Sequence, residues 1–338
     1  MIKIALLGFG NVGRAFARYL IKTDDPAARQ LGIFGIADIT GGLLLNDAGD
    51  AGWLLERQEQ GQSVADCAER GVFLTVPSFI AALPDAGITL LVECLPTNPE
   101  DGQPALDLIR GALEKHLGVV TVDKGPLVHG YQDLIDAARS HGTKLAYSGT
   151  TGVRPPAGLA GCHILEIRGV LNGTTNYILT EMQESGLTFK QALAKARDQG
   201  IAEPNPELDI QGWDTACKIL ILANEWMAAG ARLGDVVRIG IGPETEDLIR
   251  DARESGRVVR LIGRARFWEG SVRLSVAPRI VGHDSPFHAI SGTSKGAVFR
   301  TREHGDMFAA ARSGRDAIAQ TILEDIRTVL GLDTTAPD

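Results

Sequence analysis

Paired cysteines are missing from this sequence, and their absence argues against two kinds of stabilisation. The cysteines are few and scattered, at Cys67, Cys94, Cys162 and Cys217. No spacing between them matches the paired ligands of a zinc site. No secretory signal accompanies them, so nothing indicates the oxidising compartment in which disulfides form. We therefore predict neither a disulfide framework nor a metal site.

Long apolar runs and an excess of positive charge are missing as well. No apolar run reaches the length needed to cross a membrane. The chain has 42 acidic residues against 34 lysines and arginines, which gives a formal net charge of −8. That balance disfavours a nucleic-acid partner and an anionic membrane surface. We expect a cytoplasmic protein with neither kind of partner.

The length of the chain favours two domains. It has 338 residues, and its hydrophobic content of 44% is ordinary for a protein with a packed core. A glycine- and proline-rich crossing, SGTTGVRPPAG, occupies residues 148–158 and marks a boundary. We predict an α/β dinucleotide-binding domain over 1–147 and an α+β catalytic and dimerisation domain over 148–300. The segment 301–338, with a strongly amphipathic helix, is expected to dock back on the first domain.

The N-terminal domain opens with a dinucleotide-binding pattern. An apolar strand is predicted over Ile2–Leu7, and the helical run RAFARYLIKT begins at Arg14. Between them lies GFGNVG, which has the GxGxxG spacing of a Rossmann-type doubly wound parallel sheet. The glycines allow a tight turn, a close approach of pyrophosphate and close packing of the helix. The predicted phosphate loop comprises Gly8, Gly10, Asn11, Val12 and Gly13.

An acidic residue follows the second predicted strand, which runs from Leu31 to Ala37. Asp38 stands where such enzymes bind the ribose hydroxyls of the cofactor. No arginine adjoins it to receive a 2′-phosphate, so NAD is favoured over NADP. Arg57 lies further along, either folding back to a phosphate or serving as a solvated helix charge.

Two further strands end in polar loops. The strand ITLLVE is followed by Thr97 and Asn98, and the strand over residues 118–122 is followed by Lys124. Carboxyl-end loops of a doubly wound sheet line the ligand crevice. We expect these three residues to face the nicotinamide half of the cofactor.

The second half of the chain has longer, more alternating strands, in ILEIRGVL, RVVRLIGRARF and SVRLSVAPRIV. They predict an open mixed sheet that is largely antiparallel. One face of such a sheet is left for a symmetry mate, so a homodimer is expected.

The segment Glu203–Lys218, EPNPELDIQGWDTACK, combines four acids with a lysine. Pro204 and Pro206 keep its first part out of a helix. A helical pattern follows, in which Asp214 and Lys218 share one face because they are four residues apart. From these residues alone, the pair is either a surface ion pair or part of a polar site.

The segments VLNGTTNYIL and EPNPELDIQGWDTACK resemble the signatures of homoserine dehydrogenases. The GFGNVG, VECLPTNPEDGQPA, TVDKGPLV and SPFHAISGTSKGAVFRT segments are similar to the short, archaeal-type members without a regulatory domain. The resemblance extends over nearly the whole chain. It implies a hydride transfer that interconverts L-homoserine, a hydroxy amino acid, and L-aspartate 4-semialdehyde, with NAD or NADP as cofactor.

The resemblance also implies a set of site residues. Lys124 and Lys218 would flank the reacting carbonyl carbon, with one of them donating or relaying the proton. Glu203 and Asp214 would hold the amino group and the polar end of the substrate. The implied substrate residues are Thr174, which lines the pocket beside Asn172 and Gly173, together with Glu203, Asp209 and Asp214.

The sequence departs from the family pattern in three places. At the crossing, Ser148 replaces a glutamate and Arg154 replaces a glycine, so a sodium site is not expected. The usual glycine loop near the C-terminus is replaced by FAAARSG, over residues 308–314. Val122 and Asp123 replace small polar residues before Lys124.

These departures leave alternatives open. The protein is a homoserine dehydrogenase, or a related oxidoreductase for a different hydroxy acid, or an NAD-binding sensor without catalysis. In the second case Arg154 would bind an additional carboxylate. Otherwise Arg154 forms a structural ion pair at the domain hinge.

Overall fold

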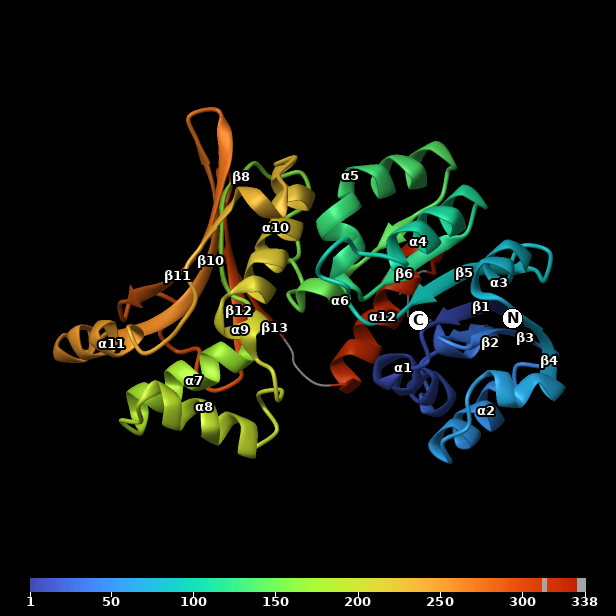
Figure 1. Cartoon of the computed structure of the whole chain (residues 1–338). Helices are drawn as coiled ribbons and strands as arrows, with labels where there is room; N and C mark the ends of the chain where they lie inside the picture. The colour runs from blue at the N-terminus through green and yellow to red at the C-terminus, as the bar shows by residue number, and fades with distance from the viewer. Residues whose placement is uncertain (312–314, 333–338) are drawn as a thin grey trace. The chain divides into compact units, whose positions relative to one another are not determined.

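The computed structural model describes residues 1–311 and 315–332. The chain forms two compact units (Figure 1). The first comprises Met1–Thr150 together with Gly314–Asp338, and the second comprises Thr151–Ser313. Residues 301–311 therefore lie in the second unit, whereas the sequence predicts a separate C-terminal segment over 301–338. The physical reason is a hairpin of strands that crosses the expected boundary at residue 300.

The first unit is built on a seven-stranded sheet in the order β4-β3-β2-β1-β5-β6-β7. Its parallel strands are β1 (Ile2–Leu7), β2 (Leu31–Asp38), β5 (Ile88–Glu93), β6 (Gly118–Thr121) and β7 (Leu145–Ala146). The antiparallel edge consists of β3 (Gly41–Leu45) and β4 (Gly71–Leu74). Strand order reverses on the two sides of β1, which confirms the predicted doubly wound sheet.

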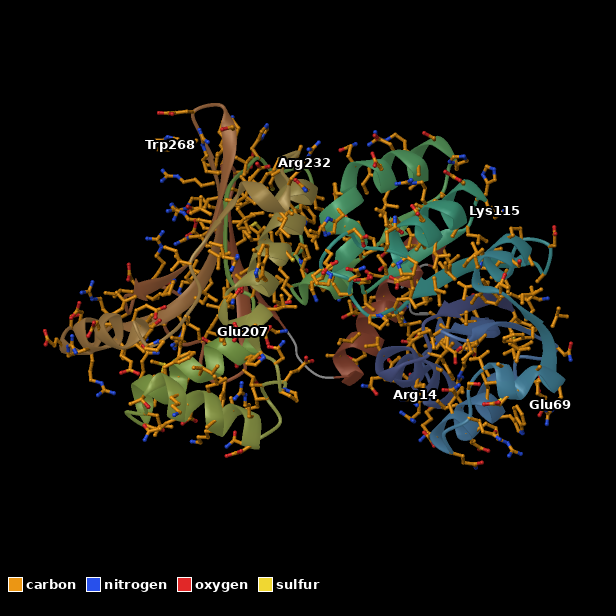
Figure 2. All side chains as sticks on the ribbon, in the orientation of Figure 1. Arg14, Glu69, Lys115, Glu207, Arg232 and Trp268 are labelled. Carbon is orange, nitrogen blue, oxygen red and sulfur yellow. The ribbon has the colours of Figure 1, made fainter. Side chains whose placement is uncertain are left out.

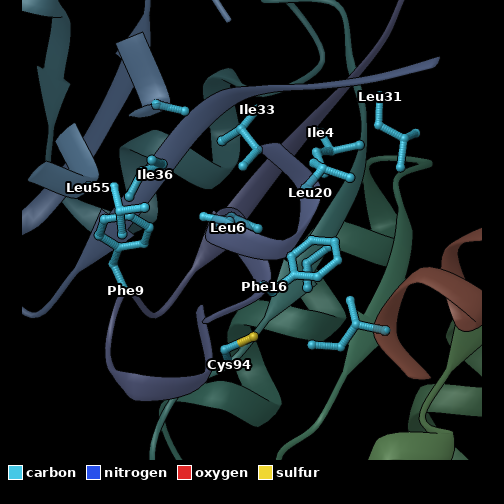
Figure 3. Packing of buried hydrophobic residues seen from close by; sticks show 14 of the residues in the cluster. Ile4, Leu6, Phe9, Phe16, Leu20, Leu31, Ile33, Ile36, Leu55 and Cys94 are labelled. Atoms are coloured by element: carbon cyan, nitrogen blue, oxygen red, sulfur yellow. The ribbon is translucent and has the colours of Figure 1, made fainter. Parts of the chain in front are cut away.

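The helices of this unit alternate with its strands. They are α1 (Asn11–Lys22), α2 (Asp50–Glu59), α3 (Val76–Ala82), α4 (Ala105–Glu114), α5 (Lys124–Ser140), α6 (Ser148–Thr151) and α12 (Arg315–Leu330). Helix α12 contacts α1, β6 and β7, so this helix packs on the first unit. Ile322 and Ile326 of α12 are fully buried in the same apolar cluster as Ile4 and Phe16. Figure 3 shows the cluster from close by, with Phe16 beside Leu6 and Ile4.

The second unit is built on a six-stranded sheet in the order β13-β12-β8-β10-β11-β9. The strands are β8 (Ile164–Val170), β9 (Val236–Arg238), β10 (Val258–Trp268), β11 (Ser271–Val281), β12 (Lys295–Thr301) and β13 (Gly305–Ala311). All neighbours pair antiparallel except β11 and β9, which pair parallel. The predicted mixed, largely antiparallel sheet is confirmed.

The segment that begins at Phe308, where the usual glycine loop is replaced, starts as a strand. Residues 308–311 belong to β13 and pair in continuous register with β12. No glycine or proline interrupts the run MFAAA, so nothing ends the strand at that point. Residues 312–314 of this segment lie outside the described residues.

Five helices complete the second unit: α7 (Gly173–Glu184), α8 (Phe189–Asp198), α9 (Glu207–Ile210), α10 (Trp213–Met227) and α11 (Thr245–Glu254). The capping box predicted at Thr188 and Gln191 is present at the start of α8. Helix α10 packs on β8, β10 and β11. Its close approach depends on Gly263 of β10, where a Cβ atom would lie 3.0 Å from Thr215 and 3.3 Å from Ile219. No described helix is long and apolar enough to cross a membrane.

Candidate active site

The loop between β1 and α1 has the geometry of a phosphate cradle. Gly8 has φ +98°, and a Cβ atom there would lie 2.6 Å from the carbonyl carbon of Cys94. A Cβ atom on Gly13 would lie 2.1 Å from the carbonyl oxygen of Gly8. A Cβ atom on Gly10 would meet nothing within 4 Å, and no side chain caps α1. Two glycines are thus required by packing, while the third faces open space at a helix N-terminus, which suits an anionic group.

Asp38 ends β2, as the sequence predicts. Its Oδ1 accepts hydrogen bonds from the amide (2.7 Å) and the hydroxyl (2.5 Å) of Thr40. Its Oδ2 accepts from the amide of Val64 at 3.1 Å. The carboxylate is therefore held in place at the carboxyl end of the strand. Arg57, on α2, lies 5.0 Å from the ring centroid of Trp53.

Sequence reasoning missed Glu93, the last residue of β5, which is fully buried. Its Oε1 accepts a hydrogen bond from the Leu95 amide at 2.6 Å, and its Oε2 accepts from the hydroxyl of Thr121. Burial, and then the charge of Asp123, raise the pKa of the Glu93 carboxyl to about 8. The feature of the sequence that could have indicated Glu93 is an acidic residue at the end of the largely apolar strand ITLLVE.

Asp123 was noted in the sequence only as a departure, but it is almost completely buried. It caps α5, because its Oδ1 accepts a hydrogen bond from the Gly125 amide at 2.9 Å. Its Oδ2 is buried without a hydrogen-bond partner among the described residues. Burial raises the pKa of Asp123, against the opposing effects of the Thr97 hydroxyl, the Gly125 amide and the charge of Lys124. Lys124 is the first residue of α5.

Thr97 and Asn98 lie in the loop after β5, as expected. The side-chain amide of Asn98 donates to Asp101 and to the carbonyl oxygen of Gln103, both at 2.9 Å. The side chain of Asn98 therefore shapes its own loop. Thr97 is exposed, and its hydroxyl reaches the carboxyl group of Asp123.

In the second unit, Asp214 and Lys218 lie on α10 and form a buried pair. The Nζ of Lys218 donates to Oδ2 of Asp214 at 2.6 Å and to the carbonyl oxygen of Leu171 at 2.9 Å. Lys218 is only 9% exposed. The pair is therefore buried rather than at the surface, and its membership of a polar site stays a prediction.

Asn172 connects this pair to a second carboxylate. It caps α7, since its Oδ1 accepts from the Thr175 amide at 2.8 Å. Its Nδ2 donates to Asp209 at 2.7 Å and to Asp214 at 2.9 Å. Burial, and then the charge of Asp214, raise the pKa of Asp209. Sequence reasoning placed Asn172 beside the pocket but did not predict that it bridges the two acids.

The remaining predicted substrate residues lie differently. The hydroxyl of Thr174 donates to the carbonyl oxygen of Ile201 at 3.3 Å and also reaches Asp209. Glu203 is exposed, and its side chain has no ion pair or hydrogen bond to any residue that the structure describes. Arg154 is exposed in the segment after α6. The structure thus gathers Asp209, Asp214 and Lys218 into one cluster that does not include Glu203.

At the crossing, an acid from α12 lies beside the position where glutamate is usual. The Oδ2 of Asp325 accepts a hydrogen bond from the Ser148 amide at 2.9 Å. Burial raises the pKa of this carboxyl to about 6. Over the described ranges, no three His, Cys, Asp or Glu side chains are grouped so that they could hold a metal ion.

Comparisons with known proteins agree on one family. Residues 156–327 match the family model described as homoserine dehydrogenase. The chain is 34% identical to the homoserine dehydrogenase of Methanocaldococcus jannaschii, over 96% of this chain and 97% of that one. It is 33% identical to the NAD(+)-dependent homoserine dehydrogenase of Pseudomonas canavaninivorans, over 96% and 95%. A hyperthermophilic archaeal homoserine dehydrogenase mutant solved in complex with NADPH is 26% identical, with a TM-score of 0.80 and coverage of 99% of both chains.

Proposed function

Because this chain belongs to the homoserine dehydrogenase family, we propose that it interconverts L-homoserine and L-aspartate 4-semialdehyde with NAD or NADP. The observation that carries the proposal is the buried cluster in which Asn172 joins Asp209 to the Asp214–Lys218 pair. Two carboxylates and an ammonium held by short hydrogen bonds provide the charges that an amino-acid substrate requires. When bound, the cofactor supplies the nicotinamide ring that accepts or donates the hydride.

Lys218 is the proposed proton donor. Its ammonium is fixed by Asp214 and by a backbone carbonyl, which leaves the third N–H of Nζ for the substrate oxygen. A charged donor in a buried position stabilises the alkoxide that develops as hydride reaches the carbonyl carbon. Lys124, at the start of α5, is proposed as the second catalytic lysine.

Asp209 and Asp214 are proposed to hold the ammonium group of the substrate. Burial, and then the charge of Asp214, raise the pKa of Asp209, while the charge of Lys218 lowers it. A substrate ammonium beside Asp209 would add a second favourable charge. Thr174 would line the pocket, and Glu203 would reach the polar end of the substrate.

The first unit fits a dinucleotide. The open space at Gly10 accommodates a phosphate at the start of α1, in a loop that Asn11 and Val12 continue. The fixed carboxylate of Asp38 suits a ribose diol, and no arginine adjoins it, which favours NAD over NADP. Thr97 and Asn98 are proposed to border the nicotinamide half.

We assign substrate binding and dimerisation to the second unit. One face of its sheet bears Arg168, Arg264 and exposed Phe308 in register across β8, β10, β12 and β13. Exposed Trp268 lies near the tip of the β10–β11 hairpin (Figure 2). Arginine and aromatic side chains are enriched in protein interfaces, which supports a homodimer. The four cysteines are free thiols, which agrees with a cytoplasmic location.

A substrate assay tests the proposal. Protein incubated with L-homoserine and NAD or NADP at alkaline pH should produce reduced-nicotinamide absorbance, and the Lys218→Ala variant should lose turnover while keeping its affinity for NAD. Turnover of another hydroxy acid but not of homoserine would favour the second candidate, in which exposed Arg154 binds an additional carboxylate. Calorimetric binding of NAD without turnover of any hydroxy acid would instead indicate a sensor.

A further inference from the structure

One buried polar atom in the first unit is left without a partner. Asp123 is 1% exposed, and its Oδ1 is used to cap α5. Its Oδ2 has no hydrogen-bond partner among the residues described. A buried acceptor without a donor is costly, and more so when it carries charge. Such an atom indicates a group that is not part of the chain.

The neighbouring acid offers no free acceptor. Glu93 has both carboxyl oxygens engaged, by the Leu95 amide and by the Thr121 hydroxyl. Burial raises the pKa of Asp123, and the Thr97 hydroxyl, the Gly125 amide and the charge of Lys124 oppose that rise. Of these two buried acids, Asp123 is the one with a carboxyl oxygen, Oδ2, that has no hydrogen-bond partner among the described residues.

The position of Asp123 in the sheet indicates which part of a dinucleotide would meet it. The phosphate cradle follows β1, and Asp38 ends β2, on one side of β1. Asp123 follows β6, two places away on the other side, in the order β2-β1-β5-β6. A dinucleotide lies across the carboxyl ends of such strands, with its pyrophosphate at the glycine loop. If the ribose next to adenine meets Asp38, the nicotinamide half extends toward β5 and β6.

Thr97 is an exposed residue in the loop after β5, and its hydroxyl reaches the carboxyl of Asp123. The buried carboxyl therefore lies beside that loop. The nicotinamide carboxamide carries an N–H₂ group that must find an acceptor when the ring is taken out of water. We propose that Oδ2 of Asp123 accepts a hydrogen bond from the carboxamide N–H₂ of the bound cofactor. Asp123 then serves as a cofactor-recognition residue, and this inference rests on the proposed function.

Calorimetry with two cofactors tests it without turnover. The second cofactor is the 3-acetylpyridine analogue of NAD, which keeps the ring carbonyl but has no N–H. Intact wild-type protein should bind NAD about tenfold more tightly than the analogue, because a buried hydrogen bond is lost. The Asp123→Asn variant should lose about tenfold in affinity for NAD and little for the analogue, so that the ratio falls toward one.

Asparagine caps helices as well as aspartate does, so Asp123→Asn should keep the start of α5. Asp123→Ser is a second capping variant whose shorter side chain withdraws the acceptor, and it should show the same loss of discrimination. Asp136→Asn makes the same charge change at an exposed position of the same helix, and should leave both affinities unchanged. Thermal unfolding of each variant reports whether the fold is retained.

The outcomes separate the two proposals. If wild-type protein binds NAD and the folded Asp123 variants keep the wild-type ratio between the cofactors, the role of Asp123 is wrong while the proposed function stands. If wild-type protein binds neither NAD nor NADP, the proposed function itself fails.

Discussion

Each unit of this protein contains a pair of neighbouring carboxyl groups. The two pairs differ in how completely their oxygen atoms are hydrogen-bonded. In the second unit, Asp209 and Asp214 share the amide of Asn172, and Lys218 adds a cation. In the first unit, a hydroxyl lies between Glu93 and Asp123, because Thr121 donates to one acid and accepts from the amide of the other. The first arrangement supplies an amide and an ammonium to its acids. In the second, Glu93 has a pKa of about 8, and one oxygen of Asp123 has no donor among the described residues.

The comparison shows how partners oppose the effect of burial. Burial raises the pKa of Glu93 and of Asp209, and a neighbouring acid raises each of them further. The Thr121 hydroxyl lowers the pKa of Glu93, and the Asn172 amide and the charge of Lys218 lower the pKa of Asp209.

The largest effect is expected from Lys218→Ala. Removing one partner of a buried ion pair takes the Lys218 ammonium away from the Asp214 carboxyl, at a cost of about 3–5 kcal/mol in the free energy of unfolding. Denaturant unfolding measures this loss. Lys195→Ala is the matched control, because the Lys195–Glu181 pair is more exposed and should cost less than about 1 kcal/mol. Equal losses of unfolding free energy in the two variants would show that the Asp214–Lys218 pair contributes no more to stability than a surface pair.

A smaller effect, spread over pH, is expected from Glu93→Gln. The folded-state pKa of about 8 lies above the ordinary value of 4.5, so between these values the folded protein holds a proton that the unfolded chain has released. The stability of the wild-type protein should therefore fall as pH rises through this window, by an amount on the order of a few kcal/mol. Glutamine mimics the protonated acid and removes this contribution.

Urea midpoints measured at about pH 5 and about pH 9 should therefore lie closer together for Glu93→Gln than for wild-type protein. If the two midpoints of Glu93→Gln differ as much as those of wild-type protein, Glu93 is ionised in the folded protein. That result would make the two acid pairs alike.

The smallest effect is expected from Thr121→Val. This change keeps the shape of the side chain but removes the hydroxyl between Glu93 and the Asp123 amide, at a cost of about 1–2 kcal/mol. Thr328→Val is the control, because the Thr328 hydroxyl bonds only within its own helix at an exposed position. Urea unfolding should show a larger loss of stability for Thr121→Val than for Thr328→Val. If the two losses are equal, the Thr121 hydroxyl does not stabilise the Glu93–Asp123 pair.

The sequence predicts those parts of the site that depend on local spacing. The GFGNVG loop, the strand that ends at Asp38 and the i, i+4 relation of Asp214 to Lys218 all follow from short-range patterns. Each one is confirmed as a local structure. Their proposed roles in binding and catalysis stay predictions.

The bridges between distant segments could not be predicted in this way. The bond from Asn172 to Asp209 spans 37 residues, and the bond from Thr121 to Glu93 spans 28. Both depend on how α7, α9 and the strand ends pack in space. The pairing of the strand at Phe308 with β12 likewise depends on contacts between segments, and the departure from the family's glycine loop did not by itself indicate a strand.

The close packing at Gly263 has a consequence for how this sequence can vary. The atoms nearest to a Cβ at that position belong to Thr215, Ile219 and Leu171. Thr215 and Ile219 flank the Asp214–Lys218 pair along the chain, and the carbonyl oxygen of Leu171 accepts from Lys218. A methyl group on the sheet would therefore displace the helix and loosen the lysine without touching a ligand. The lack of a side chain at Gly263 sets the distance between α10 and the sheet, and therefore how deeply Lys218 is buried. It also limits which substitutions the sheet beneath the helix can accept.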